Sequence, residues 1–154
     1  MASLIFVGRN EKLMELSLPL AHIMTVQLHT LCTEDCADRL GPIFRTHKIH
    51  HIPITDEEGR LAGIISQTDY ERIRYGASLF RNPDADAYNE ALLRSLRVSD
   101  LMTKDVQVLR PTDTMAQAYQ ILKENTFRAI PIVDKGKLVG IVSALDLLHF
   151  CFEN

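Results

Sequence analysis

The chain carries one sequence pattern twice, and this internal repeat limits its fold more than any other feature. Residues 52–69 read Ile-Pro-Ile-Thr-Asp-Glu-Glu-Gly-Arg-Leu-Ala-Gly-Ile-Ile-Ser-Gln-Thr-Asp, and residues 130–146 read Ile-Pro-Ile-Val-Asp-Lys-Gly-Lys-Leu-Val-Gly-Ile-Val-Ser-Ala-Leu-Asp. The agreement begins upstream, at Met24-Thr25 and Met102-Thr103, and needs one deletion, in a glycine-containing turn where a length change costs least. One copy alone would be marginally stable, whereas two copies packed together can share one core.

Composition restricts the partners of the chain. Of its 154 residues, 46% are hydrophobic and 24% are charged, as in an ordinary globular protein, and its net charge of −3 argues against broad binding to nucleic acid or anionic membranes. The first residues lack the basic region and the length of a signal peptide, and no apolar run approaches the ~20 residues of a membrane span. We therefore expect a cytoplasmic location, no membrane contact, and free thiols at Cys32, Cys36 and Cys151, the first two partly buried.

The spacing of apolar residues predicts a β-α-β-β-α order in each copy, which is a mixed helix and strand fold. In the second copy four apolar residues recur at helical spacing: Met115, Ala118, Tyr119 and Leu122. Thr112 and Asp113 are the N-cap candidates of that helix. The first copy keeps apolar residues in the matching places but carries Gly41-Pro42, which should kink or shorten its helix.

The strands are expected on either side of these helices. Short strands over 28–31 and 106–109 precede the helices, and a leading helix is expected over 11–22. Strands over 130–133 and 138–142 follow, joined by a tight turn over 134–137. Pro53 and Pro131 inside such strands indicate a sheet edge, or a ladder interrupted at a ligand groove. Ser66 and Ser143 should each begin a helix, ending near Tyr75 and Cys151.

The pattern divides the chain into four parts: a leading segment (1–19), a first repeat (20–79), an insert (80–96) and a second repeat (97–154). In the insert, Tyr88, Leu92 and Leu96 lie at helical spacing. The sequence does not fix whether that helix packs on this chain or on a partner.

The doubled pattern resembles the cystathionine-β-synthase (CBS) domain. It comprises Met-Thr, a strand, a helix, Ile-Pro-Ile, Asp…Gly and Leu-x-Gly-Ile-x-Ser-x-x-Asp, and it covers about residues 20–79 and 97–151. The resemblance implies a tandem pair, or Bateman module, in which two repeats pack sheet to sheet with pseudo-twofold symmetry. It also implies a homodimer, clefts that bind AMP, ADP, ATP, NAD or S-adenosylmethionine, and regulation of an attached or partner protein without catalysis.

Each copy ends in a hydroxyl and a carboxylate, at Ser66 and Asp69 and at Ser143 and Asp146. A serine at the start of a helix lies beside unpaired N–H groups and the positive end of the helix dipole, which suits a phosphate. An aspartate one turn later can accept two hydrogen bonds from the cis hydroxyls of a ribose. The alternative, which the sequence leaves open, is that each pair only caps its helix.

Other residues are nucleotide-binding candidates through the resemblance, which implies that the backbone at His51 and Ala129 contacts the adenine edge. Arg128 and Lys104 could reach phosphates, although a surface salt bridge or a solvated side chain is the alternative for each. The remaining candidates are Thr25, Val26, Gln27, His50, Ile52, Pro53, Thr68, Thr103, Asp105, Ile130 and Pro131. Both copies keep the Ser-x-x-Asp element, so the chain could hold two ligands; because His51 is bulkier than Ala129, we expect the cleft at Asp146 to be the preferred one.

The sequence leaves two other functions open. The cluster His47, His50 and His51 could make the chain a metal-responsive module, although a solvent-facing loop end is the simpler interpretation and no metal is expected. A scaffold that only dimerises, with degenerate clefts, is the other alternative. No nucleophile–base pair or catalytic motif is present in the sequence, so we expect no enzyme and no required cofactor, only a regulatory adenine nucleotide or S-adenosylmethionine and an unidentified protein partner.

Overall fold

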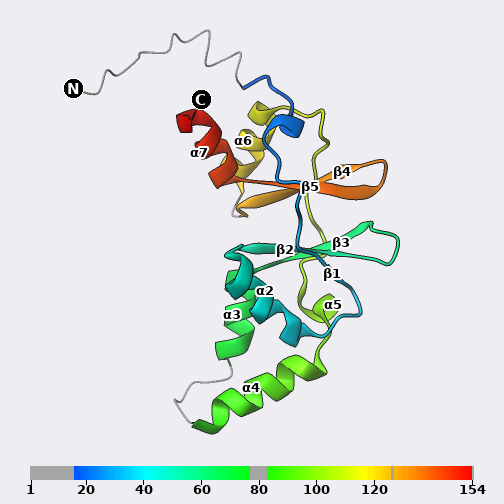
Figure 1. Cartoon of the computed structure of the whole chain (residues 1–154), viewed down its shortest axis with the longest axis vertical. Coiled ribbons are helices and arrows are strands. Elements are labelled where there is room, and N and C mark those ends of the chain that lie inside the picture. Colours follow the sequence, from blue (N-terminus) through cyan, green and yellow to red (C-terminus); the bar gives the residue numbers. More distant parts are fainter. Residues whose placement is uncertain (1–15, 77–82, 126, 154) are drawn as a thin grey trace, which may run out of the picture. The chain divides into compact units, whose positions relative to one another are not determined.

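The structure is a computed structural model, and it describes residues 16–76, 83–125 and 127–153. The described chain forms two compact units (Figure 1). Unit 1 comprises Met1–Val26, Gln107–Asp134 and Val139–Asn154, and unit 2 comprises Gln27–Val106 and Lys135–Leu138. Each unit therefore combines one copy of the repeat with a segment from elsewhere in the chain.

Unit 2 contains the first copy, in the expected β-α-β-β-α order. Its strands are β1 (Leu31–Cys32), β2 (His51–Thr55) and β3 (Leu61–Ser66), and its helices are η2 (Ala37–Arg39), α2 (Leu40–His47), α3 (Gln67–Gly76), α4 (Pro83–Ser95) and α5 (Val98–Leu101). β2 is the middle strand of the sheet, parallel to β1 and antiparallel to β3. The core includes Ile52, Ile54 and Ile65, each at most 1% exposed.

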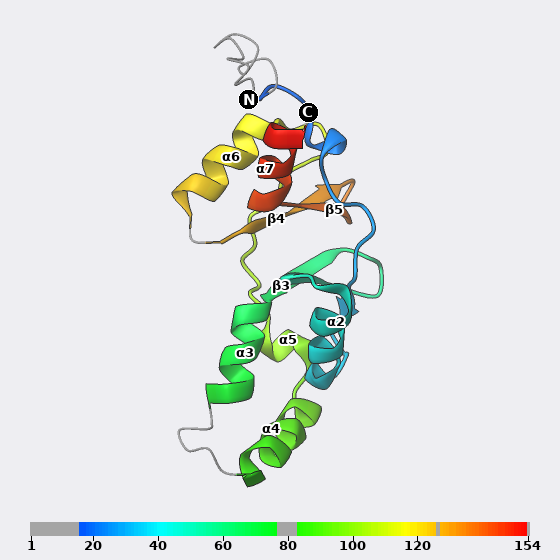
Figure 2. The ribbon, with the colours of Figure 1, turned by 60° about the vertical axis from the view of Figure 1, so that its left-hand side comes forward.

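Unit 1 contains the second copy and the 3-10 turn η1 (Leu20–His22). Its strands β4 (Ala129–Asp134) and β5 (Lys137–Ser143) pair, and its helices α6 (Met115–Glu124) and α7 (Ala144–Glu153) lie side by side (Figures 1 and 2). Leu20, Met115, Ile130, Ile132 and Val142 form the center of its core.

Several local predictions are confirmed. The turn between β4 and β5 has positive φ at Lys135 (48°) and Gly136 (80°), as a two-residue hairpin turn requires. α3 and α7 begin directly after Ser66 and Ser143. In the first copy the α-helix starts only at Leu40, after a 3-10 turn, and Pro42 lies in its first turn, where the missing N–H has no intrahelical role.

Other predictions need correction. The leading helix over 11–22 is reduced, within the described residues, to the 3-10 turn η1. The strand over 28–31 is only β1, and the strand over 106–109 is a single bridge from Leu109 to Ile132. α6 is capped by Thr114, whose hydroxyl accepts from the N–H of Gln117, and not by Thr112 or Asp113. The carboxylate of Asp113 instead accepts from the N–H of Arg110.

The insert forms α4, which packs against η2 and α3 of unit 2. Its buried residues are Asn89 and Leu93, each 3% exposed, whereas Tyr88 is 63% exposed. The face marked by Tyr88 and Leu92 is therefore not the packing face, because a helix with apolar residues on adjoining faces can bury either one.

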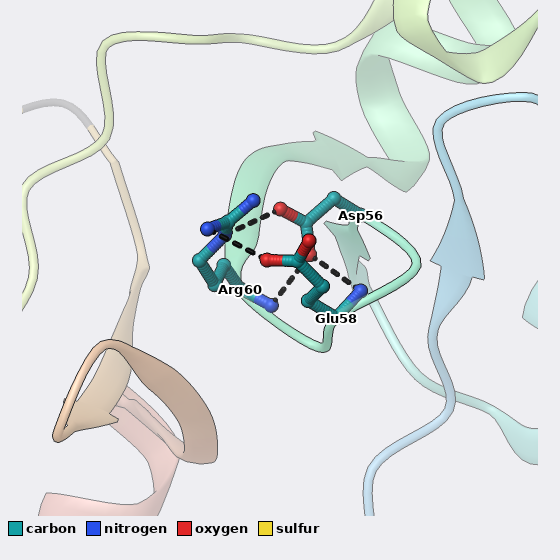
Figure 3. Close-up of polar contacts among 3 residues, drawn as sticks. All are labelled: Asp56, Glu58 and Arg60. Atoms are coloured by element: carbon teal, nitrogen blue, oxygen red, sulfur yellow. Dashed lines mark hydrogen bonds and ion pairs between the residues drawn. The ribbon is translucent and has the colours of Figure 1, made fainter.

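The hairpin turn between β2 and β3 is held by side chains (Figure 3). Oδ1 of Asp56 accepts from the N–H groups of Glu58 and Arg60, each at 2.9 Å, and Nε of Arg60 donates to Oδ2 of Asp56 at 2.7 Å. This hydrogen bond from Arg60 is the main reason why the pKa of Asp56 is lowered. Gly59, with φ of 78°, supplies the left-handed residue of the turn.

The first residues of each repeat pair with the hairpin of the other repeat. Thr25 exchanges two backbone hydrogen bonds with Ile141 of β5, at 2.9 and 3.0 Å. Thr103 exchanges the equivalent pair with Ile64 of β3, at 2.9 and 3.0 Å. This exchange explains why each unit contains residues from two distant parts of the sequence.

Candidate functional site

The Ser143–Asp146 pair lies at the junction of β5 and α7 in unit 1. Oδ2 of Asp146 accepts from both the N–H and the hydroxyl of Ser143, each at 2.6 Å, and the N–H of Asp146 donates to Oγ of Ser143 at 3.2 Å. These reciprocal bonds form a cap, the local arrangement expected of Ser-x-x-Asp at a helix start. The cap fixes the carboxylate and uses one of its two oxygens.

The Ser66–Asp69 pair makes the matching junction of β3 and α3 in unit 2. The hydroxyl of Ser66 donates to Oδ2 of Asp69 at 2.5 Å and accepts from the N–H of Asp69 at 3.1 Å. Both copies of the motif are thus helix caps. Capping leaves Oδ1 of each aspartate available for another donor, so it does not exclude a ligand.

The remaining oxygens differ between the two copies. Oδ1 of Asp69 faces Nη1 of Arg72 at 3.4 Å, an exposed ion pair one helical turn away. Within the described residues, Oδ1 of Asp146 receives no hydrogen bond from the protein. The matching position to Arg72 in the second copy is His149, so the sequence itself removes this cation from Asp146.

The helix starts are less open to phosphate than the sequence indicates. In α7 the N–H of Ala144 donates to the carbonyl of Arg128 at 3.1 Å, and that of Asp146 bonds Ser143. In α3 the N–H of Gln67 donates to the carbonyl of His50 at 2.8 Å in the same way. In the first turn of α7, the N–H of Leu145 is therefore the one donor without a hydrogen bond among the described residues. The predicted phosphate contact can use this one backbone donor and not the whole first turn.

The predicted binding residues form two groups, each within one unit. Unit 1 holds Thr25, Val26, Arg128, Ala129, Ile130, Pro131, Ser143 and Asp146. Unit 2 holds Gln27, His50, His51, Ile52, Pro53, Ser66, Thr68, Asp69, Thr103, Lys104 and Asp105. Because the first residues of each repeat pair with the other repeat, Thr25 is grouped with Asp146, and Thr103 with Asp69.

The strand residues in both groups contribute backbone, not side chains, to any surface. The side chains of Ile52, Pro53, Ile130 and Pro131 are fully buried. The parallel ladder between β1 and β2 begins at Ile54, whereas the antiparallel ladder between β2 and β3 continues through Pro53, which pairs with Ile64. Pro53 therefore lies beyond the end of one ladder and inside the other, and the expected ligand groove stays a prediction.

The residues that precede the Ile-Pro-Ile strands differ in chemistry. His51 is half-buried, and its pKa is lowered by burial and by the nearby His50, with the charge of Asp69 acting in the opposite direction. Ala129 is 5% exposed and brings no titratable group. Arg128, Lys104, Thr25 and Thr103 are all exposed, so their side chains are free to contact a ligand from solvent.

The metal hypothesis has no geometric support in the described part of the chain. There, no three His, Cys, Asp or Glu side chains are arranged to hold a metal ion. The ring of His47 instead stacks on that of His29, with centroids 3.5 Å apart. Cys32, Cys36 and Cys151 are free thiols as predicted, but Cys32 and Cys36 are exposed and not partly buried, because they lie at the end of β1 and in the turn before η2.

One functional neighbour was missed by the sequence predictions. Arg72 follows Asp69 by three residues on α3, a spacing that places two side chains on the same helix face and could have revealed the ion pair.

Comparison with known proteins decides the family. The model of the CBS domain matches residues 20–74 and 98–153, which is most of the chain. The chain belongs to the CBS domain family. A CBS domain-containing protein of Dictyostelium discoideum is 27% identical over 135 residues, covering 85% of this chain and 89% of the relative. The predicted tandem CBS pair is confirmed.

Solved CBS structures share the fold. The CBS domain of a CBS domain-containing membrane protein from Sphaerobacter thermophilus superposes with a TM-score of 0.77 at 26% identity, covering 92% of this chain and 93% of that one. CBSX2 in complex with AMP gives 0.71 at 23% identity, with 88% and 96% covered. The CBS domain pair of protein MJ0100, in complex with 5′-methylthioadenosine and S-adenosyl-L-methionine, gives 0.68 at 22% identity, with 87% and 95% covered. No described helix of this CBS pair is long and apolar enough to cross a membrane.

Proposed function

We propose that this CBS pair is a regulatory module that binds an adenosine-containing ligand of the AMP, ADP, ATP, NAD or S-adenosylmethionine class and passes its state to a protein partner. The observation that supports this most directly is the free Oδ1 of Asp146, on a carboxylate that Ser143 holds in place. A fixed carboxylate oxygen is suited to accept hydrogen bonds from the two hydroxyls of a ribose. The solved relatives that bind AMP, methylthioadenosine or S-adenosylmethionine support the ligand class.

The asymmetry between the copies supports Asp146 as the principal site. Asp69 would have to exchange its ion pair with Arg72 for a ligand, and the half-buried His51 is a bulkier side chain than Ala129 at the matching position. An incoming ligand therefore meets less competition at Asp146. Arg128 is exposed, and its backbone carbonyl accepts a hydrogen bond from the first turn of α7. It is our candidate for a phosphate contact, because a guanidinium can bind a phosphate through two donors.

The role we assign is binding and not catalysis. A sensor changes its partner by differential binding of the ligand to two states, and this needs no cofactor and no reacting group in the chain. We propose that the module acts in the cytoplasm as a homodimer, without a nucleic-acid or membrane partner.

The alternative function is a dimerising scaffold without a ligand. It is favoured by the capping bonds, which give Ser66, Asp69, Ser143 and Asp146 a structural role that needs no nucleotide. Nucleotide titration separates the two functions.

Titration calorimetry and thermal shift with AMP, ADP, ATP, NAD and S-adenosylmethionine test the proposal. At ~100-fold excess over its dissociation constant, a ligand that binds only the folded chain adds about 2.7 kcal/mol to the free energy of unfolding. Asp146→Asn keeps an oxygen that can accept from Ser143 but loses the charge. We expect it to weaken binding about 10- to 100-fold, the loss of a charge-assisted hydrogen bond.

Asp113→Asn is the matched control, because Asp113 also accepts a backbone N–H, from Arg110 at 2.7 Å, in the same unit. It should leave affinity unchanged, and Asp69→Asn should weaken binding less than Asp146→Asn. Absence of binding for all five ligands, or equal binding by Asp146→Asn and the wild-type chain, would overturn the proposal in favour of the scaffold.

A further inference from the structure

Two of the three thiols of the chain flank a single turn in unit 2. Cys32 is the last residue of β1, and Cys36 directly precedes η2. Both residues are exposed, and both thiols are free. The third cysteine, Cys151, lies on α7 in unit 1, which contains no second cysteine. Cys32 and Cys36 are therefore the two thiols that local chain geometry brings near each other.

Hydrogen bonds close the turn between the two thiols. The carbonyl of Cys32 accepts from the N–H of Asp35 at 3.0 Å, and the N–H of Cys32 donates to Oδ2 of Asp35 at 2.7 Å. A β-turn closed in this way holds the α-carbons of its first and fourth residues within about 7 Å. Cys36 adjoins the fourth residue, so the turn brings it back toward Cys32. A disulfide needs α-carbons about 4.4–6.8 Å apart, a separation that such a turn favours.

The turn is fastened to the segment that connects the two repeats. The N–H of Val98, the first residue of α5, donates to the carbonyl of Asp35 at 2.9 Å, so the turn lies beside α5 (Figure 1). Arg97 forms a backbone bridge with Cys36 and an ion pair with Glu34. A disulfide across the turn would therefore lock the place where this connecting segment is attached.

The internal repeat shows that the turn does not require cysteine. At the matching positions of the second copy lie Arg110 and Thr114. The turn is nevertheless the same, because the N–H of Arg110 donates to Oδ2 of Asp113 at 2.7 Å and its carbonyl accepts from the N–H of Asp113 at 3.0 Å. Both exposed cysteines are thus a property of the first copy alone, which favours a role for the thiols themselves over a role in folding.

We propose that Cys32 and Cys36 are a redox-modification site, at which a small disulfide such as glutathione disulfide converts the two thiols reversibly into an intramolecular disulfide. The thiolate of one cysteine attacks a sulfur of the oxidant, which forms a mixed disulfide and releases one glutathione. The thiolate of the other cysteine attacks the protein sulfur of this mixed disulfide, which forms the bond between Cys32 and Cys36 and releases the second glutathione. Two electrons pass from the protein to the oxidant, and the two thiol protons end on the released glutathione thiols. An exposed bond of this kind is readily reduced again, as a redox-sensing disulfide in a reducing compartment must be.

Redox titration of the whole chain tests the proposal. The reduced protein is equilibrated in glutathione buffers of graded ratio, the remaining thiols are alkylated, and the chain is cleaved after Glu34, which lies between the two cysteines. Mass spectrometry of the oxidised chain should then show the two halves of the turn still joined. The equilibrium constant of this disulfide should be at least ~10-fold larger in the folded chain than in urea, because the turn raises the effective concentration of one thiol at the other.

Single cysteine variants are the controls. Cys36→Ser should stop at the mixed disulfide with glutathione, whereas Cys151→Ser should form the joined product like the wild-type chain. Absence of the joined product from the folded chain at every glutathione ratio would overturn the proposal. So would an equilibrium constant in the folded chain that is equal to or below the value in urea, since the turn would then hold the thiols apart, or a joined product that links two chains. The test uses no nucleotide, so its result is independent of the proposed function.

Discussion

The sulfur of Met102 lies directly over Gly63 in the middle of β3. A β-carbon at Gly63 would be 2.6 Å from this sulfur and 2.7 Å from the carbonyl oxygen of Thr103. The same relationship recurs in the other unit, where a β-carbon at Gly140 would be 2.8 Å from the sulfur of Met24. The glycines of the repeat therefore allow each exchanged segment to approach the strand with which it pairs.

Gly63→Ala should destabilise the chain by about 1–3 kcal/mol, because the carbonyl oxygen of Thr103 belongs to the backbone and cannot move aside without loss of the Thr103–Ile64 bonds. Gly140→Ala should be milder, since the nearest backbone oxygen, that of Thr25, is 3.2 Å away. Urea unfolding measures both. Gly59→Ala is the control without steric contact, because no atom lies within 4 Å of the added β-carbon. Only the positive φ at this position should lower its free energy of unfolding, by about 1 kcal/mol. Equal losses at Gly63 and Gly140 would contradict the role of the carbonyl.

Removal of either capping hydroxyl should have a similar effect on stability. Ser66→Ala and Ser143→Ala each remove a bond to the N–H of the aspartate three residues later, and each should lower the free energy of unfolding by about 1 kcal/mol. Thr68→Ala, on the same helix but outside the cap, should change it by less than about 0.5 kcal/mol. If both serine variants were as stable as the Thr68 control, the cap would contribute nothing measurable.

Asn89 is a polar residue on the buried face of α4, where it lowers the stability of the chain. It is 3% exposed, and its Oδ1 has no hydrogen-bond partner among the described residues, so this oxygen lacks the compensation that buried polar groups normally have. Asn89→Leu, which keeps the branching at Cγ, should raise the free energy of unfolding by about 1–3 kcal/mol. Chemical denaturation measures the gain, and Ala91→Leu on the exposed side of α4 serves as the control. A loss of stability in Asn89→Leu would show that the amide is satisfied by a water molecule or another group.

Stability should fall on the acid side because of His51. Its pKa is lowered in the folded chain from 6.5, chiefly by burial and then by His50. Between the lowered value and 6.5, the unfolded chain binds a proton that the folded chain does not, so the free energy of unfolding decreases as the pH falls through 6.5. His51→Gln should remove this part of the pH dependence in denaturant titrations at about pH 7.5 and about pH 5.5. His22→Gln, an exposed control, should retain it, and an unchanged slope in His51→Gln would refute the assignment.

Local features of the chain were predictable where short-range chemistry decides them. The turn at Lys135 and Gly136, and the helix starts after Ser66 and Ser143, depend on a few adjacent residues whose backbone preferences act alone. The cap of α6 is predicted one or two residues too early, since Thr112, Asp113 and Thr114 all have side chains suited to capping, and only the three-dimensional path selects Thr114.

The face on which α4 packs could not be predicted in this way. Leu96 lies at helical spacing from both Leu92 and Leu93, so spacing alone does not decide whether Leu92 or Leu93 faces the interior. Docking against η2 and α3 decides between them by burying Leu93 together with Asn89. Because Asn89 is polar, the sequence does not indicate that it lies on the buried face of α4.

The sequence by itself determined the duplicated CBS pattern, the order of strands and helices in each copy, and the two Ser-x-x-Asp junctions, because these depend on residue type and spacing within a few turns. Only the tertiary structure decided that Thr25 joins the unit of Asp146 and Thr103 that of Asp69. It also decided that α7 keeps an apolar face in solvent. Such pairings join residues far apart in the chain, and their free energy depends on packing and on backbone hydrogen bonds that local spacing does not specify.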